Sequence, residues 1–482
     1  MEIRLKRRKL FSILIHSFII IILVACKPAA APHNEVVTDN AAAMVVKEPQ
    51  PAPEKGIIHP MRSAASDATV TYTLYIPQSC GDNEKCPLLL LFDPQGKGTI
   101  PVKKYKDLAE KHKMILMCSN TSRNGNGQEE SNRIIKTLIG EAVQQLPSDS
   151  NRIYAGGFSG GGRVATMVLT HYKKLKGIIS IAAGSTPAPT AKTCRYIGVA
   201  GLQDFNYKEV KEAEKKLHGV MPVTALYHNG IHEWCPADVM EKIMLLLDTD
   251  AMRNKMLAVN NKQLRNEATT ARQEAGAMER SGNFSAAVDR LVFSMECLKD
   301  LLEDKELSAA YQRLTKSPAY EKNKNENDQL DKDQGLITDK YVQMMGQPLD
   351  QWQDAIKVLN TEMNKTKDSP RYFMYKRVLA SLSIQCYMLC RQNIYNTNMK
   401  NAVYLSDLYL LIDPQNKDAH YYAAIIAARN NKPDKVYSEL NESVKYGFTD
   451  SEMAMGENAF RSISNTPQFN AIMHKIETNS KL

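Results

Sequence analysis

The stretch from Arg152 to Arg163 constrains this chain more than any other. It reads Arg-Ile-Tyr-Ala-Gly-Gly-Phe-Ser-Gly-Gly-Gly-Arg, with a strand-like apolar run entering it and a helix-like run leaving it. The pattern Gly157-x-Ser159-x-Gly161 between a strand and a helix predicts a sharp turn that exposes the serine oxygen. Glycines suit this turn because strand and helix approach too closely for side chains. The backbone N–H of Gly160, at the predicted helix start, can then face a developing oxyanion.

Two residues downstream take similar positions in the chain. Asp204 follows an apolar run that ends at Ala200, and it is the only aspartate between Ser159 and His232. His232 follows another apolar run, which ends at Tyr227. Functional sites of open α/β sheets are built where strands end. A serine, an acid and a histidine in this chain order form the nucleophile, orienting acid and base of one class of hydrolase.

Strand-like and helix-like runs alternate between residues 56 and 249, which favours a mostly parallel sheet covered on both faces. The short apolar run Leu88 to Phe92 is typical of a buried parallel strand. Of the 24 glycines, 18 lie in this region and six after residue 250. We therefore expect an α/β domain over 57–249, able to fold and act alone, and an all-α domain over 250–482.

The α/β region resembles a known family. Residues 68–249 look like a small α/β-hydrolase, most similar to the poly(3-hydroxybutyrate) depolymerase and feruloyl esterase group. In that group an Arg-(Val/Ile)-Tyr strand leads into Gly-(Tyr/Phe)-Ser-x-Gly-Gly, matched here by Arg152-Ile-Tyr and Gly157-Phe-Ser-Gly-Gly. The resemblance implies Ser159 as nucleophile, His232 as base and Asp204 as orienting acid. It leaves the substrate open.

The loop after Phe92 departs from the family pattern. The group carries His-Gly at this place, whereas this chain reads Asp93-Pro94-Gln95-Gly96. Proline has no N–H to donate, so the sequence predicts Gln95 as the second oxyanion donor beside Gly160, with Gly96 as the alternative. Asp93 is expected to anchor the loop by accepting backbone N–H bonds.

Other interpretations of these residues stay open at this point. The glycine-rich stretch could bind phosphate, although it lacks the P-loop and dinucleotide-binding patterns. Asp204 could cap the following helix, with Glu209 as the alternative acid. His218 and His228 also follow Asp204, and Trp234 could line the site or belong to the core.

The first 25 residues are typical of a processing signal: a basic start, then an apolar run that ends in Leu-Val-Ala-Cys26. This end resembles the lipobox of bacterial lipoproteins and implies that Cys26 is lipidated. An ordinary signal peptide or a short membrane anchor is the alternative. Residues 26–56, rich in Ala and Pro, are expected to form a disordered tether. The sequence thus predicts a lipid-anchored protein of the bacterial envelope, facing the periplasm.

Past residue 250 the apolar residues recur with a helical period. Helices are expected over 261–280, 284–301, 402–411, 418–430 and 433–446. The charged run Lys322 to Lys332 is either an exposed loop or a solvated helix. Pro414 and Phe448 end successive units 34 residues apart, which resembles tetratricopeptide repeats. The domain would then bind a protein partner, or it packs on the hydrolase and binds nothing.

Charge and cysteine usage exclude some functions. The net charge of +9 falls to +5 without residues 1–25, and no basic cluster with aromatics appears, so nucleic acid is not an expected partner. Cys80 and Cys86 flank a polar turn that suits a local disulfide in an exported chain. Cys386 and Cys390 are too few ligands for zinc. We expect no metal and no cofactor.

Together these observations favour a serine esterase that forms an acyl-enzyme on Ser159. The expected substrate is a small-molecule or carbohydrate-linked ester. Two other functions remain: a serine peptidase that uses the same three residues, and a non-catalytic envelope assembly protein that works through its helical repeats.

Overall fold

The computed structural model describes residues 51–481. The predicted signal peptide, the Cys26 lipidation site and most of the predicted tether lie outside this part. The strands are β1 (Ile58–Ser63), β2 (Thr71–Tyr75), β3 (Cys86–Phe92), β4 (Ile115–Ser119), β5 (Ser148–Phe158), β6 (Gly177–Ile181), β7 (Arg195–Gly201) and β8 (Val223–His228). The helices that alternate with them are α2 (Thr99–Lys111), α3 (Gln128–Gln144), α4 (Gly160–His171), α5 (Tyr207–Leu217) and α6 (Ala237–Arg253).

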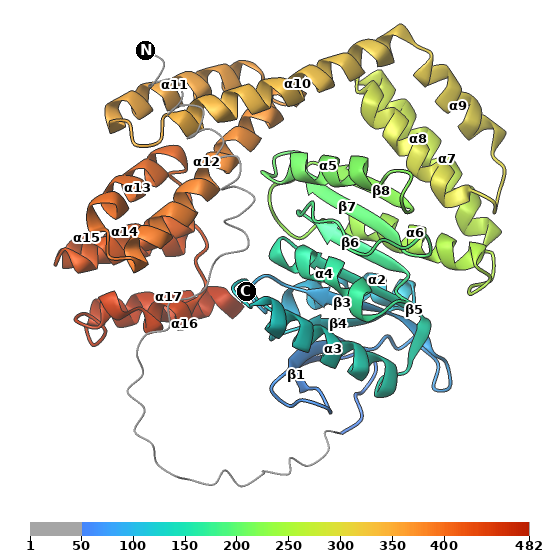
Figure 1. The fold of residues 1–482 in the computed structure, drawn as a ribbon, viewed down its shortest axis with the longest axis horizontal. Helices are drawn as coiled ribbons and strands as arrows, with labels where there is room; N and C mark the ends of the chain where they lie inside the picture. The colour runs from blue at the N-terminus through green and yellow to red at the C-terminus, as the bar shows by residue number, and fades with distance from the viewer. Residues whose placement is uncertain (1–50, 482) are drawn as a thin grey trace. The chain divides into compact units, whose positions relative to one another are not determined.

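The eight strands form one sheet in the order β1-β2-β4-β3-β5-β6-β7-β8. Strands β4, β3, β5, β6 and β7 run parallel, whereas β1 and β2 are antiparallel at one edge. Figure 1 shows the sheet with its helices lying along it. The predicted fold class, a mostly parallel α/β sheet followed by an all-α part, is confirmed.

Strand β3 shows why these residues form a central parallel strand. All seven of its residues are buried, as expected where helices cover both faces of a sheet. Leu88 and Leu90 share one hydrophobic cluster with Ile134 and Leu138 of α3 and Val168 of α4. Helices α3 and α4 therefore cover one face of the sheet. On the other face α6 reaches the sheet, where the Leu247 side chain lies against Gly177 of β6.

The edge strand β1 was not predicted. Its sequence, Ile-His-Pro-Met-Arg-Ser, includes a proline. The large apolar side chain of Met61 is 67% exposed. Such a mixed pattern is typical of an edge strand, where one side faces solvent. It gives neither the continuous apolar run nor the clean alternation that identified the other strands.

The chain divides into two compact units, and the division is not a single cut. The first unit runs to Val259 except for two short segments, Gly201–Lys208 and Tyr227–His232. These segments belong with Asn260–Leu482 to the second unit. The predicted boundary at 249 falls inside α6, which ends at Arg253. The chain is helical on both sides of residue 249, and a domain boundary there stays a prediction.

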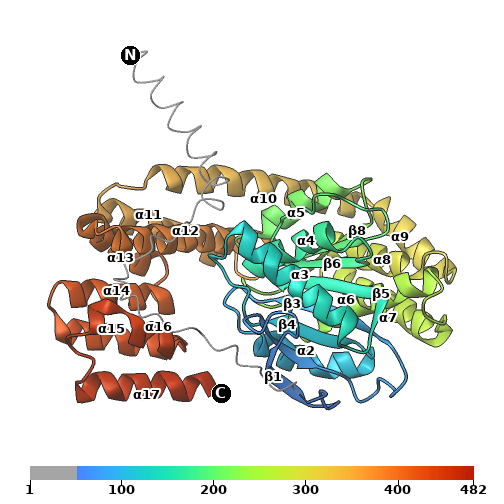
Figure 2. The ribbon, with the colours of Figure 1, turned by 60° about the horizontal axis from the view of Figure 1, so that its bottom comes forward.

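The second unit is otherwise helical. Its helices are α7 (Asn261–Arg280), α8 (Phe284–Leu298), α9 (Lys305–Thr315), α10 (Pro318–Gln343), α11 (Leu349–Lys365), α12 (Pro370–Tyr395), α13 (Met399–Ile412), α14 (Lys417–Arg429), α15 (Pro433–Lys445), α16 (Ser451–Gly456), the short 3-10 helix η1 (Asn458–Phe460) and α17 (Pro467–Lys481). Figure 2 shows α13 to α17 stacked along one end of this unit. One hydrophobic cluster runs from Leu330 to Ile476.

Two sequence predictions for this unit can be compared with the structure. The charged run Lys322 to Lys332 lies inside α10. Of the two alternatives, an exposed loop and a solvated helix, the structure therefore shows the helix. Asp418–Asn430 and Pro433–Tyr446 correspond closely to α14 and α15. The similarity to tetratricopeptide repeats stays a prediction. No helix among residues 51–481 has the length and apolar character that crossing a bilayer requires.

Candidate active site

Ser159 lies between the last residue of β5 and the first residue of α4. Its backbone has φ 52° and ψ −119°, a left-handed conformation that costs energy for a residue with a side chain. The turn is held because the Ser159 N–H donates to the carbonyl oxygen of Ile181, at 2.8 Å. Strain of this kind is typical of a residue whose side chain must be presented at one fixed place.

The glycines around Ser159 are required by close backbone packing. A Cβ atom on Gly157 would collide with the carbonyl group of Gly161. A Cβ atom on Gly161 would collide with the carbonyl oxygen of Phe92, the last residue of β3. Strand β5, helix α4 and strand β3 therefore meet backbone to backbone under Ser159. The motif found in the sequence has the physical role that was predicted for it.

Gly160 is the first residue of α4, and the N–H groups of a first helical turn have no partner within the helix. A Cβ atom on Gly160 would collide with the side-chain amide of Asn124, from the loop after β4. The Asn124 N–H in turn donates to the carbonyl oxygen of Pro94, at 2.8 Å. The loops after β3 and β4 thus pack together beside the start of α4.

Asp93 anchors the loop after β3, as the sequence predicted. Its carboxylate accepts hydrogen bonds from the N–H groups of Gln95, at 2.8 Å, and Lys97, at 3.1 Å. Its other oxygen accepts one from the indole N–H of Trp234, at 3.0 Å. Asp93 is buried, with 4% of its surface exposed. A buried carboxylate that accepts three N–H bonds is a strong local anchor.

The same contacts correct the second predicted oxyanion donor. The Gln95 N–H points to the Asp93 carboxylate, and the Gly96 N–H donates to the Asp93 carbonyl oxygen at 3.2 Å. Both N–H groups are used inside the turn, because an aspartate before Pro-x-Gly folds the chain back onto its own side chain. The prediction that Gln95 donates to the oxyanion is therefore wrong in this structure.

Trp234 is a core residue. It is 6% exposed, and its ring packs against Tyr105 and against Phe158, the neighbour of Ser159, with ring centres 6.2 and 5.8 Å apart. This settles the alternative left by the sequence. Trp234 supports the turn from below and does not line an open site.

Asp204 and His232 are brought together in the second unit. Oδ1 of Asp204 lies 2.9 Å from Nδ1 of His232 and also accepts the N–H of Asn206 at 2.8 Å. Asp204 is fully buried, and its Oδ2 accepts no hydrogen bond from the described residues. The His232 ring stacks on Phe205 with centres 4.2 Å apart. A buried carboxylate on Nδ1 orients an imidazole and stabilises its protonated form.

Backbone hydrogen bonds hold the segments of Asp204 and His232 side by side. The Leu202 N–H donates to the His228 carbonyl oxygen at 2.8 Å, and the Gln203 N–H to that of Gly230 at 3.0 Å. A Cβ atom on Gly201 would collide with the Gly230 carbonyl group, so this close approach requires glycine. The structure thus selects His232, and neither His218 nor His228, as the partner of Asp204.

Glu209, the alternative acid, has a different role. Its two carboxylate oxygens accept from both terminal nitrogens of Arg163, at 2.6 and 2.8 Å. Arg163 lies in the first turns of α4 and Glu209 in the first turn of α5. This bidentate ion pair links two helices of the first unit. Ser159 also belongs to the first unit, and its pairing with His232 stays a prediction.

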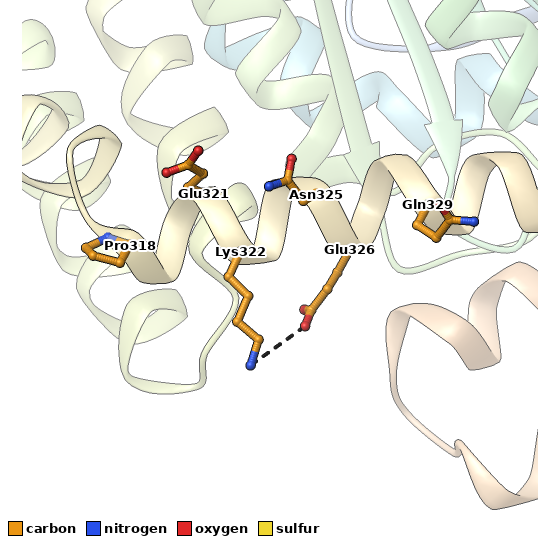
Figure 3. A pocket seen from close by; sticks show the side chains of 6 residues that line it. All are labelled: Pro318, Glu321, Lys322, Asn325, Glu326 and Gln329. Atoms are coloured by element: carbon orange, nitrogen blue, oxygen red, sulfur yellow. Dashed lines mark ion pairs between the residues drawn. The ribbon is translucent and has the colours of Figure 1, made fainter.

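A surface hollow is lined by residues of α10 alone, and Figure 3 shows its six side chains, among them the exposed ion pair of Lys322 and Glu326 at 3.9 Å. Its lining includes no serine, cysteine or histidine. No group of three His, Cys, Asp or Glu side chains in residues 51–481 could hold a metal ion.

Cys80 and Cys86 form a disulfide in the structure, with Cα atoms 6.2 Å apart. The other cysteines of the described residues are buried and form no disulfide: Cys118, Cys194, Cys235, Cys297, Cys386 and Cys390. The bridge closes the polar turn before β3.

Comparisons with known proteins find only distant structural similarity. No family model and no curated protein sequence matches the chain. Among solved structures, an esterase from the archaeon Pyrobaculum calidifontis aligns with 11% identity over 41% of this chain and 87% of its own, with a TM-score of 0.34. A ferulic acid esterase aligns with 14% identity over 37% of this chain and 91% of its own, with a TM-score of 0.32. Thermogutta terrifontis esterase 2, phosphorylated by paraoxon, aligns with 12% identity over 44% of this chain and 99% of its own, with a TM-score of 0.33.

Proposed function

We propose that this protein is a serine hydrolase that cleaves carboxylic esters through an acyl-enzyme on Ser159. The observation that carries the proposal is the Ser159 turn, a non-glycine residue at φ 52° between a central parallel strand and a helix. A purely structural turn at this place would take glycine without strain. The strain is explained if the serine side chain must be presented for attack.

The hydrogen bond between Asp204 and His232 supplies the second part of the proposal. With Nδ1 directed to the carboxylate, Nε2 is the nitrogen that exchanges a proton with a hydroxyl. Ser159, Asp204 and His232 all follow the last residues of strands in one sheet. Their order in the chain and their positions after strands support a triad of these three residues.

In the proposed reaction His232 takes the proton of Ser159 as its oxygen attacks the ester carbonyl. The imidazolium is stabilised by Asp204, and the Gly160 N–H donates to the oxyanion. The alcohol leaves with the proton from His232, and the acyl group remains on Ser159. Water then attacks the acyl-enzyme with His232 as base, and Ser159 recovers its proton.

A labelling and turnover experiment tests this function. The full chain and its Ser159→Ala variant are treated with a fluorophosphonate probe, and then with nitrophenyl esters of increasing acyl length beside a matched peptide series. We expect labelling and ester turnover in the wild type only. Absence of both from folded wild-type protein would reject the hydrolase, and turnover confined to peptides would replace the esterase with a peptidase.

We also propose that the protein is anchored in the bacterial envelope by a lipid on Cys26. The support is the sequence alone, an apolar run that ends in Leu-Val-Ala-Cys. Membrane fractionation of wild type and Cys26→Ala tests it. The wild type is expected in the membrane fraction and the variant unprocessed or released. Wild-type protein found wholly in the soluble fraction would end this proposal.

A further inference from the structure

Arg377 of α12 is a buried cation whose hydrogen-bond acceptors are uncharged. Only 4% of its surface is exposed, and burial lowers the pKa of its guanidinium, while Tyr207 and Asp331 act in the opposite direction. It forms no ion pair with a carboxylate of residues 51–481. Burying a charge without a counter-ion is costly. An apolar side chain of similar size would fill the same space without this cost, so the contacts of the guanidinium require an explanation.

These contacts converge on the segment that carries Asp204. Nη1 of Arg377 donates to the carbonyl oxygen of Leu202 at 2.7 Å. The guanidinium carbon lies 4.4 Å from the centre of the Tyr207 ring, within the range of a cation–π contact. Leu202 precedes Asp204 by two positions, and the Tyr207 N–H donates to the Asp204 carbonyl oxygen at 3.0 Å. Arg377 therefore contacts the Asp204 segment on both sides of the acid.

The arginine is itself held in place. Nε of Arg377 donates to the side-chain oxygen of Gln334 on α10 at 2.7 Å, and Gln334 is 5% exposed. The Tyr207 ring also packs on the ring of Tyr227, with centres 4.9 Å apart. Tyr227 is the first residue of the segment that carries His232. The planar guanidinium of Arg377 thus donates to Gln334 of α10 and to the Asp204 segment at once, a geometry that lysine cannot reproduce.

We infer that Arg377 is a positioning residue, which fixes the segment Gly201–Tyr207 so that Asp204 keeps the His232 ring oriented. The inference rests on the proposed function. It makes Arg377 of α12, held by Gln334 of α10, a support of the acid Asp204. The expectation that residues 57–249 are active alone does not agree with this inference, because such a chain lacks both helices.

The test compares Arg377→Met with Arg371→Met in the full chain. Arg371 lies on the same helix and pairs with Asp333 of α10 at 3.3 Å, with 43% of its side chain exposed, so it controls for a lost contact between the two helices. Small displacements of catalytic groups cost on the order of 100-fold in rate. We expect Arg377→Met to lower kcat about 10- to 100-fold at nearly unchanged KM, and Arg371→Met to match the wild type.

A double-mutant cycle separates positioning from a general loss of structure. If Arg377 acts through Asp204, its substitution should cost almost nothing more in an Asp204→Asn background. A multiplicative loss in the double variant would overturn the inference, as would wild-type kcat in folded Arg377→Met. Should Arg377→Met fail to fold, Arg377→Gln, which keeps a polar end but is too short for the Leu202 carbonyl, decides on the same criteria.

The cycle also keeps the two proposals apart. Wild-type protein that neither turns over esters nor reacts with the fluorophosphonate probe counts against the hydrolase itself. Active wild type with an equally active Arg377→Met counts against the positioning role alone.

Discussion

Nδ1 of His232 lies 2.9 Å from Oδ1 of Asp204, although 28 positions of sequence separate the two residues. The carboxylate is fully buried, so water does not compete for this hydrogen bond. The contact fixes which ring nitrogen carries the proton. The first prediction follows from it.

Asp204→Asn is expected to lower kcat by about 10⁴-fold, because an amide can hold the ring in the wrong tautomer. Ser159→Ala and His232→Ala should be comparably inactive, and double variants little worse, because the three residues act as a unit. Glu209→Gln is the matched control, since Glu209 pairs with Arg163. The assignment is wrong if Glu209→Gln abolishes turnover while Asp204→Asn retains it.

Gly160→Ala is expected to lower kcat at least tenfold, because the new methyl group would collide with the Asn124 amide. The start of α4, or the loop after β4, must then shift away from Ser159. A second change, Asn124→Gly, removes the obstacle and should restore most of the activity. Steady-state kinetics of the single and double variants check this. Full activity in Gly160→Ala alone would show that the contact is not a constraint.

Asp93→Ala should destabilise the first unit by about 3 kcal/mol, because it leaves one buried and two partly buried N–H groups without their acceptor. The three donors are Gln95, Lys97 and Trp234. Asp82→Ala is the control. Its carboxylate is 97% exposed in an ion pair with Lys55, and such pairs contribute little. Urea unfolding measures both changes, and equal midpoints would refute the anchoring role.

The buried thiols should resist modification in the folded protein. Burial raises the pKa values of Cys235, Cys386 and Cys390 to about 12. The thiolate, the reactive form, is therefore scarce at pH 8. We expect no reaction of these three cysteines with a disulfide reagent until denaturant is added. Rapid labelling of any of them under native conditions, read by mass spectrometry, would contradict their placement.

Glu110 should make stability depend on pH in the acid range. Burial alone would raise the pKa of Glu110, but hydrogen bonds from Tyr75, Gln78 and Ser79 outweigh it and lower the pKa. A carboxyl group with a lowered folded-state pKa stabilises above its unfolded value of about 4.3, and this stability is lost as pH falls through the folded-state pKa.

Glu110→Gln is therefore expected to lower the Tm at pH 7 and to approach the wild type near pH 3. Glu129→Gln, an exposed change in the first turn of α3, is the control. Thermal unfolding across this range measures the effect. A difference in Tm that stays constant with pH would mean that the carboxylate charge is not involved.

Much of the fold could be predicted because buried parallel strands have a distinctive sequence. Leu88 to Phe92 is a continuous apolar run, and it is fully buried in β3. The Ser159 turn was equally clear, since its motif is local. Asp204 and His232 could be proposed because each follows an apolar run and the chain order fits, and the structure pairs them. Each of these signals lies within a few residues of the feature it predicts.

The remaining features depend on contacts that no local pattern shows. Gln95 was predicted as the donor because Pro94, at the corresponding place in the loop, has no N–H. In the structure the Asp93 side chain accepts the hydrogen bond of the Gln95 N–H. An Asp-Pro-x-Gly turn signal could have revealed this. Arg377 gives no local signal at all, since its contact with Leu202 spans 175 positions.

The packed glycines under Ser159 also affect how mutational scans of this stretch should be interpreted. Alanine at Gly157 or Gly161 would push apart the backbones of β5, α4 and β3 and so displace a serine that is chemically intact. Loss of activity at these positions would report a change of shape. An alanine scan alone would therefore assign too many residues to the chemistry. Reactivity of Ser159 toward a small phosphonate, measured beside turnover, distinguishes a displaced nucleophile from a missing one.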